Sequence, residues 1–134
     1  MSWADYIKNL MGPDVQDACI CGFNPPSVWA AEQGGNLCRI TAAEISALAA
    51  DERSGFFING LTLGGMRCSV IRDNFADTFT MDVRTKSTEG PTYNIGICKT
   101  CTAFVIVMGK EGVHGGLVNE KAYSMGKYLR DLSM

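Results

Sequence analysis

Cysteine and histidine are the residues with which this chain could build metal or redox chemistry. The sequence contains six cysteines and one histidine, His114. Cys98 and Cys101 have the Cys-x-x-Cys spacing of zinc sites and redox pairs. A closed zinc site needs four ligands, and there is no second Cys-x-x-Cys pair. We interpret the two cysteines as small apolar residues at a strand end, and we expect no metal and no other cofactor.

Catalytic motifs give little support to an enzyme. His114 has no serine or aspartate partner at a recognised spacing, and six thiols make a chance cysteine–histidine combination uninformative. Gly109-Lys110 is not followed by serine or threonine, so it is not a phosphate-binding loop. We therefore predict no catalytic residue. The competing hypothesis is a cysteine-dependent or zinc enzyme built on Cys98, Cys101 and His114, which metal analysis of the purified chain would distinguish.

Four aromatic residues favour a binding function instead. Trp3 and Tyr6 lie one turn apart on a predicted first helix, Trp29 lies on a short strand, and Tyr128 lies near the end of a predicted last helix. If the two helices pack together over that strand, the four rings converge in one groove. Aromatic grooves bind proline-rich segments, because the polyproline II helix is already formed. The alternative for Trp3 and Tyr6 is ordinary core packing.

Capping patterns place the helices that would position these residues. Ser2-x-x-Asp5 and Thr41-x-x-Glu44 are capping boxes, which predict helices beginning after Ser2 and Thr41. Gly12-Pro13 ends the first helix. The apolar face of the first helix is formed by Trp3, Tyr6, Ile7, Leu10 and Met11, and that of the second by Ile45 and Leu48. The last helix follows His114-Gly-Gly116, and its predicted apolar stripe is Leu117, Ala122, Met125, Leu129 and Leu132.

Between the helices, short apolar or alternating runs predict strands. They cover residues 15–23, 28–31, 61–63, 67–73, 79–85, 92–98 and 103–108. The last run is apolar throughout and predicts a strand covered on both faces. Alternation in the fourth run places Cys68, Val70 and Arg72 on one side of the sheet, while residues 56–58 fit either a helical turn or a strand edge. Short turns imply an antiparallel sheet, so the fold class is α+β.

Composition limits the classes of protein and of partner that fit this chain. The 134 residues, with 46% hydrophobic and 19% charged content, fit one soluble globular domain spanning residues 1–134. The net charge of −2 argues against nucleic acid as a partner. We see no signal peptide and no membrane-spanning run, so we expect a cytoplasmic location and reduced cysteines.

The segments that indicate a family run in order along nearly the whole chain. They are Ser27-Val-Trp-Ala-Ala31, Phe56-Phe-Ile-Asn-Gly-Leu-Thr-Leu-Gly-Gly65, Cys68-Ser-Val-Ile-Arg-Asp73, Met81-Asp-Val-Arg-Thr-Lys-Ser87 and Met108-Gly-Lys-Glu-Gly-Val-His-Gly-Gly-Leu117, followed by Asn119, Lys121-Ala-Tyr123 and Lys127-Tyr-Leu-Arg130. These segments closely resemble the corresponding parts of animal profilins. The resemblance implies a central antiparallel sheet. It also implies that the first and last helices pack together on one face and shorter helices cover the other.

The profilin resemblance implies two principal partners, proline-rich proteins and monomeric actin. The residues implied for proline binding are Trp3, Tyr6, Ser27, Trp29, Tyr128, Leu129 and Met134. Those implied for actin binding are Phe57, Ile58, Val70, Arg72, Lys86, Asn94, Val113, His114, Gly116, Asn119 and, at a position often held by lysine, Glu120. Met134 stands where the family commonly has an aromatic residue. We expect Glu120 to weaken actin binding without abolishing it.

A third implied activity is modest binding of phosphoinositide head groups through Arg67, Arg84 and Lys86. Together these features predict a monomeric, cytoskeleton-associated protein that regulates actin polymerisation and nucleotide exchange on actin. The alternative is a profilin-like adaptor that keeps the proline site and has weakened or lost actin binding.

Overall fold

A seven-stranded antiparallel sheet forms the centre of the molecule. The computed structural model describes residues 2–87 and 89–134, and within them the strand order is β2-β1-β7-β6-β5-β4-β3. The strands are β1 (Val15–Phe23), β2 (Pro26–Ala31), β3 (Leu61–Leu63), β4 (Met66–Asn74), β5 (Thr80–Thr85), β6 (Asn94–Lys99) and β7 (Ala103–Gly109). All neighbouring strands pair antiparallel, as the short turns predicted.

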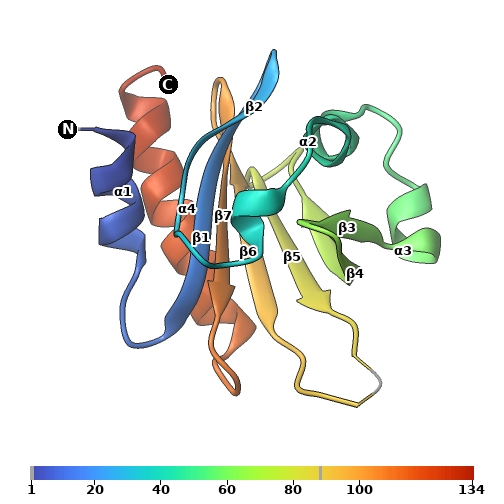
Figure 1. Ribbon diagram of the computed structural model, residues 1–134. Helices are drawn as coiled ribbons and strands as arrows, with labels where there is room; N and C mark the ends of the chain where they lie inside the picture. The colour runs from blue at the N-terminus through green and yellow to red at the C-terminus, as the bar shows by residue number, and fades with distance from the viewer. Residues whose placement is uncertain (1, 88) are drawn as a thin grey trace.

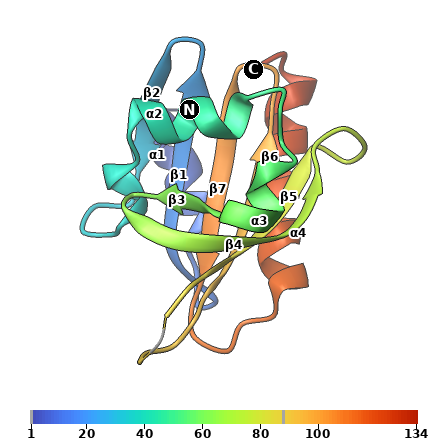
Figure 2. The same ribbon diagram turned by 90° about the vertical axis from the view of Figure 1, so that its right-hand side faces the viewer.

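Helices cover the two faces of the sheet separately. Helices α1 (Trp3–Leu10) and α4 (Gly115–Asp131) lie side by side on one face, with the two chain ends close together (Figure 1). The short η1 (Leu37–Arg39), α2 (Ala42–Ala49) and α3 (Gly55–Asn59) lie on the opposite side (Figure 2). The predicted α+β arrangement is confirmed, and α3 resolves the open alternative at residues 56–58 in favour of a helix.

Strand β7 joins the two cores that these layers enclose. Its residues are all buried, and they alternate between the faces. Phe104, Ile106 and Met108 belong to the core under α2, whereas Val105 and Val107 belong to the core under α1 and α4. The prediction of a strand covered on both faces is confirmed.

Helix α4 is rotated relative to the predicted apolar stripe. The residues it buries are Val118, Ala122, Gly126 and Leu129, while Leu117 and Leu132 are exposed. The stripe was therefore wrong at Leu117 and Leu132. The reason is close packing: an added methyl group on Gly126 would lie 2.2 Å from the Sγ atom of Cys98 on β6. Small residues face the sheet because the helix backbone approaches it closely.

A β-bulge in β4 overturns a second expectation. Val70 pairs with Val83 and Arg72 pairs with Asp82, so Ile71 is the extra residue. Residues paired across strands share a face, and Asp82 accepts a hydrogen bond from Asn119 on α4. Arg72 therefore faces the α4 side, opposite to the core that contains Val70. The predicted common side for Cys68, Val70 and Arg72 was wrong because strict alternation ends at the bulge.

Glu44 ties the start of α2 to the turn between β3 and β4. Its carboxylate accepts hydrogen bonds from the backbone N–H groups of Thr41, at 2.9 Å, Gly64, at 3.0 Å, and Gly65, at 3.2 Å. Burial alone would raise the pKa of Glu44, but hydrogen bonds from Thr41, Thr62, Gly65 and Gly64 outweigh burial and lower it below its ordinary value. The predicted capping box at Thr41 is confirmed and extends to a second element.

We expect Glu44→Gln to destabilise the fold by about 1 kcal/mol near neutral pH. Because the pKa of the folded-state carboxyl is lowered, the stabilisation is present above its unfolded-state pKa and is lost as pH falls through the folded-state pKa. Urea unfolding of both proteins across this range checks the sign. A difference that stays constant down to strongly acidic pH would contradict the role of the charge.

Candidate functional site

An aromatic cluster forms where α1, β2 and α4 meet. The ring of Trp3 lies 4.7 Å from that of Trp29 and 5.3 Å from that of Tyr6, measured between centroids. Tyr6 in turn lies 5.9 Å from Tyr128. An added methyl group on Gly22 of β1 would lie 2.5 Å from the Trp29 ring, so glycine there lets the indole pack closely on the strand. The structure thus brings together the four rings that the sequence singled out.

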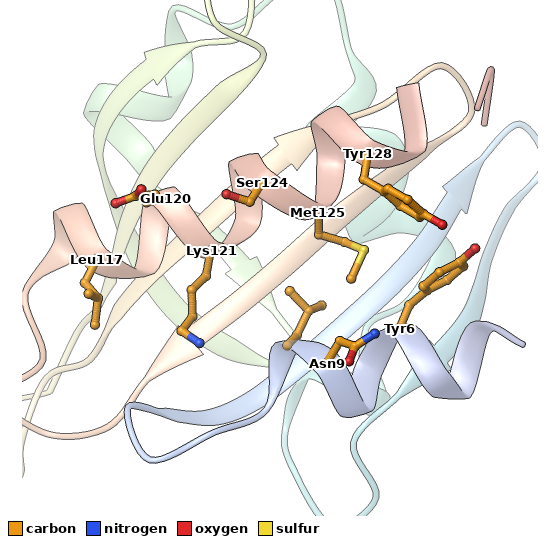
Figure 3. A pocket seen from close by; sticks show the side chains of 9 residues that line it. Tyr6, Asn9, Leu117, Glu120, Lys121, Ser124, Met125 and Tyr128 are labelled. Atoms are coloured by element: carbon orange, nitrogen blue, oxygen red, sulfur yellow. The ribbon is translucent and has the colours of Figure 1, made fainter. Parts of the chain in front are cut away.

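The two tyrosines form the boundary of this cluster towards a cleft between the helices. Tyr128 is exposed, whereas Tyr6 is largely buried. Burial raises the pKa of the Tyr6 hydroxyl, and the nearby Tyr128 raises it further by a smaller amount. Both hydroxyls point into the space between α1 and α4 (Figure 3). The raised pKa keeps the Tyr6 hydroxyl neutral at physiological pH, and a neutral phenol can donate a hydrogen bond to a ligand.

The other three residues implied for proline binding differ in their access to solvent. Ser27 is exposed on β2, and Met134 is half-buried against the core under the terminal helices. Two hydrogen bonds anchor the backbone of Met134. Its N–H donates to the carbonyl oxygen of Leu129, and its own backbone oxygen accepts from the N–H of Cys101, both at 2.8 Å. Leu129 has no exposed surface. It can support the cluster from below but cannot contact a ligand.

The cleft extends beyond the aromatic cluster along both helices. Its volume is about 690 Å³. Besides Tyr6 and Tyr128 it is lined by Asn9, Leu10, Leu117, Glu120, Lys121, Ser124 and Met125 (Figure 3). Of these seven residues, Glu120 alone was expected from the sequence to contact a ligand. A three- to four-residue spacing across α4 was the signal that could have found Leu117, Lys121 and Ser124.

A second, larger groove lies between strands β4, β5 and β6 and the start of α4. Its volume is about 1030 Å³. It collects six of the residues implied for actin binding, namely Arg72, Asn94, Val113, His114, Gly116 and Asn119. His114 caps α4, since its Nδ1 accepts the N–H of Gly116 at 3.0 Å. The groove is also lined by Ile71, Asp82 and Tyr123, for which no role was predicted from the sequence.

Hydrogen bonds fix the polar side chains of this groove. Asn94 donates to the carbonyl of Val113 at 3.0 Å and accepts from Nε of Arg84 at 3.0 Å. Asn119 donates to Asp82 at 2.7 Å, which joins α4 to β5. These bonds hold amide groups of β6 and α4 in set orientations, so the groove presents a pre-organised polar surface.

Comparison with known proteins now decides the family. The sequence model of the Profilin family matches residues 1–134. The chain belongs to the profilin family. It is 53% identical over 133 residues to Profilin-1 of Bos taurus, with 96% of this chain and 95% of that protein covered. It is 54% identical over 134 residues to Profilin-2 of Rattus norvegicus, with 96% of each covered.

A solved structure confirms the profilin fold. The structure of mouse profilin IIa in complex with a double repeat from the FH1 domain of mDia1 superposes with a TM-score of 0.96 at 49% identity, and the match covers 100% of both chains. The resemblance stated from sequence motifs is therefore confirmed over the full length of the chain.

The remaining residues implied by the profilin resemblance are dispersed. Phe57 and Ile58 are exposed on α3, with 59% and 84% of their surface accessible, whereas Val70 is buried in the core. Glu120 lines the cleft between α1 and α4 rather than the groove around His114. The implied actin-binding set therefore occupies more than one surface of the molecule.

The three cations implied for phosphoinositide binding are also divided. Arg67 and Lys86 line a third cavity of about 570 Å³ beside α2 and α3. Arg84 lies in the groove around His114, where its side chain is bonded to Asn94. The structure therefore brings two of the three cations together.

The cysteines have no arrangement that suggests chemistry in this profilin-family chain. Cys98 is buried beneath α4 as expected, but Cys101 is exposed, so the apolar interpretation fails for Cys101. Burial raises the pKa of Cys98 to about 11 and that of Cys68 to about 12, which keeps both thiols protonated and unreactive at neutral pH. In residues 2–87 and 89–134, no three metal-ligating side chains cluster together. None of the helices described there is long and apolar enough to cross a membrane.

Proposed function

We propose that this chain, acting as a single monomeric domain over residues 1–134, binds proline-rich segments and monomeric actin on separate surfaces. The observation that carries the proposal is the aromatic cluster of Trp3, Tyr6, Trp29 and Tyr128. Membership of the profilin family supports the actin-binding half.

Proline binding follows from the chemistry of the aromatic cluster. The faces of aromatic rings pack against pyrrolidine rings, and a polyproline II ligand loses little conformational entropy on binding. Indole N–H and phenol O–H groups donate to the ligand's carbonyls. Met134 packs flexibly beside the rings, but it lacks the hydrogen-bonding tip of a tyrosine.

Actin binding is assigned to the groove around His114, with Phe57 and Ile58 as further contacts. Arg72 and His114 supply cationic and hydrogen-bonding groups for an acidic partner, and Gly116 permits close approach to the start of α4. We assign no catalytic role to any of these residues. Nucleotide exchange on actin would follow from a shift in actin's own conformational equilibrium. A cytoplasmic, cytoskeleton-associated protein that sequesters monomers and delivers them to filament ends fits this chemistry.

The first test of the proposal is titration of monomeric actin with this protein, with and without a polyproline peptide. Saturable actin binding that the peptide leaves little changed would support two separate surfaces. Peptide binding without detectable actin binding would favour the second candidate, an adaptor that uses only the proline site. This candidate stays open because Glu120 stands where the profilin resemblance implies lysine.

We expect Arg72→Glu to lower actin affinity by about five-fold or more, mainly through slower association, because an exposed cation becomes a repelling anion. Stopped-flow measurement of actin association checks this. Lys8→Glu on α1 is the matched control, since it makes the same charge change on a helix that packs on β1 and β2, across the sheet from the strand that carries Arg72. Equal association rates for the Arg72 variant and the parent would show that Arg72 is not part of the actin interface.

Glu120→Lys should raise the actin association rate modestly, because reversing a charge at an exposed rim is worth roughly 0.2–1 kcal/mol. The same stopped-flow experiment measures this. Unchanged association would mean that Glu120, which lines the cleft between the terminal helices, has no role in actin binding.

For phosphoinositides we propose modest binding at Arg67 and Lys86, the two cations that share a cavity. The net charge of −2 limits the affinity. Arg84 is bonded to Asn94 and is a weaker candidate.

A further inference from the structure

Arg53, in the segment between α2 and α3, joins α2 to the sheet. Its Nε donates a hydrogen bond to the carboxylate of Asp73 on β4. One terminal nitrogen donates to the carbonyl oxygens of Leu48, at 2.6 Å, and Ala50, at 3.0 Å, at the end of α2. The other terminal nitrogen lies 3.7 Å from Sδ of Met81 on β5. All three guanidinium nitrogens therefore have partners, from the end of α2 and from two strands.

Two aromatic rings pack against the same guanidinium group. Its Cζ lies 4.6 Å from the centroid of the Phe75 ring and 5.0 Å from that of the Phe56 ring. Phe75 is buried in the core under α2, whereas Phe56 belongs to α3 and is half-buried against that core. A guanidinium group can stack on rings while its edge donates hydrogen bonds. Arg53 thus links α3 to the core as well as α2 to β4.

Helix α3 has little stability of its own. It has five residues, none of them buried, and the hydroxyl of its N-cap residue Ser54 bonds to Glu52 and does not cap the helix. Helices this short are marginal in isolation, so tertiary contacts fix its place. Phe57 and Ile58 expose 59% and 84% of their surface. Because they directly follow Phe56 in the chain, the contacts of Phe56 also set the direction in which they point.

We propose that Arg53 is a positioning residue for actin binding. By holding Phe56 against the core, it fixes α3 in the place from which Phe57 and Ile58 contact actin. Side chains that are held in place before binding lose less conformational entropy in the complex, and the gain appears mainly as slower dissociation. The inference rests on the proposed actin binding, to which it adds a residue that acts through α3.

A double-mutant cycle on the whole protein tests the inference. Arg53→Lys keeps the charge but loses the planar stack and the fork of donors, and Phe57→Ala/Ile58→Ala removes the side chains to be positioned. We expect Arg53→Lys to weaken actin binding about three- to ten-fold in the parent, through faster dissociation, and by at most about 1.5-fold when both residues are already alanine. Arg39→Lys is the matched control, since it makes the same exchange at an exposed arginine of η1 and should leave actin affinity unchanged.

Hydrogen exchange reports the position of α3 without actin. The N–H of Gly60 donates to the carbonyl of Phe56 at 2.9 Å and closes the helix, so its exchange should be faster in Arg53→Lys than in the parent. A cooperative thermal transition shows that the variant is folded. If Arg53→Lys does not fold, Asp73→Asn, which keeps an oxygen acceptor for Nε of Arg53 but removes its charge, takes its place in the cycle.

The outcomes separate this inference from the proposed function. No loss of affinity in the parent background, an equal loss in both backgrounds, or unchanged exchange at Gly60 would overturn the positioning role while actin binding itself stands. If Phe57→Ala/Ile58→Ala bound actin as the parent does, α3 would lie outside the interface and the inference would fail with that part of the proposed surface. Absence of saturable actin binding by the parent would overturn the proposed actin binding and this inference together.

Discussion

Replacing Trp3 with alanine should weaken binding of a proline-rich peptide about thirty-fold. Trp3 is one of the two inner rings of the cluster, since it contacts both Trp29 and Tyr6. Aromatic residues at the centre of an interface typically cost about 2 kcal/mol or more on truncation, and 2 kcal/mol corresponds to about thirty-fold in dissociation constant. Isothermal titration calorimetry with the peptide measures the change in dissociation constant without relying on tryptophan fluorescence.

Two controls separate a lost contact from a damaged fold. Thermal unfolding of the Trp3 variant must show a cooperative transition, because Trp3 also packs against the core of the terminal helices. Phe57→Ala removes an exposed ring from α3, and we expect it to lower actin affinity while peptide affinity stays near that of the parent. If the folded Trp3→Ala protein bound the peptide with unchanged affinity, the role of Trp3 would be purely structural.

Gly126→Ala should destabilise the protein by about 1–3 kcal/mol, although alanine favours a helix over glycine by about 1 kcal/mol. The added methyl group would lie 2.2 Å from Sγ and 2.9 Å from Cβ of Cys98, so α4 must move away from β6. Urea unfolding measures the loss. Gly115→Ala on the same helix is the matched control, because its methyl group would meet Asn94 at an ordinary 3.5 Å.

A double-mutant cycle tests the cause of this loss. Cys98→Ala removes Sγ but keeps Cβ, so the Cys98→Ala/Gly126→Ala protein should recover part of the stability, with a favourable coupling of about 0.5–3 kcal/mol. Strictly additive effects would mean that the two residues are not in conflict. Helix α4 would then tolerate the methyl group by another route.

Local signals in the sequence were sufficient for most of the secondary structure. The two capping boxes, at Ser2 and Thr41, are formed by groups three residues apart, and both are present. The apolar run of β7 is long enough to identify a strand buried on both faces. Such features can be read because the interacting groups are neighbours along the chain.

The aromatic residues could be named from the sequence, but their convergence depended on packing. Trp3 and Trp29 come together only because α1 lies over β2, and Tyr128 joins them from α4, more than a hundred residues along the chain from Tyr6. The groove around His114 likewise combines β4, β5, β6 and α4. No periodicity within one segment carries this information.

The sequence by itself determined the α+β class, the positions of most helices and strands, and which aromatic residues are candidates for ligand binding. Capping, alternation and long family motifs were the signals. Only the tertiary structure decided which faces are presented. The bulge at Ile71 turns Arg72 towards α4, and the contact of Gly126 with Cys98 rotates α4 so that Leu117 is exposed. The same rotation places Lys121 in the cleft. These outcomes depend on close packing between segments distant in sequence, where a difference of one methyl group changes how closely two elements can approach.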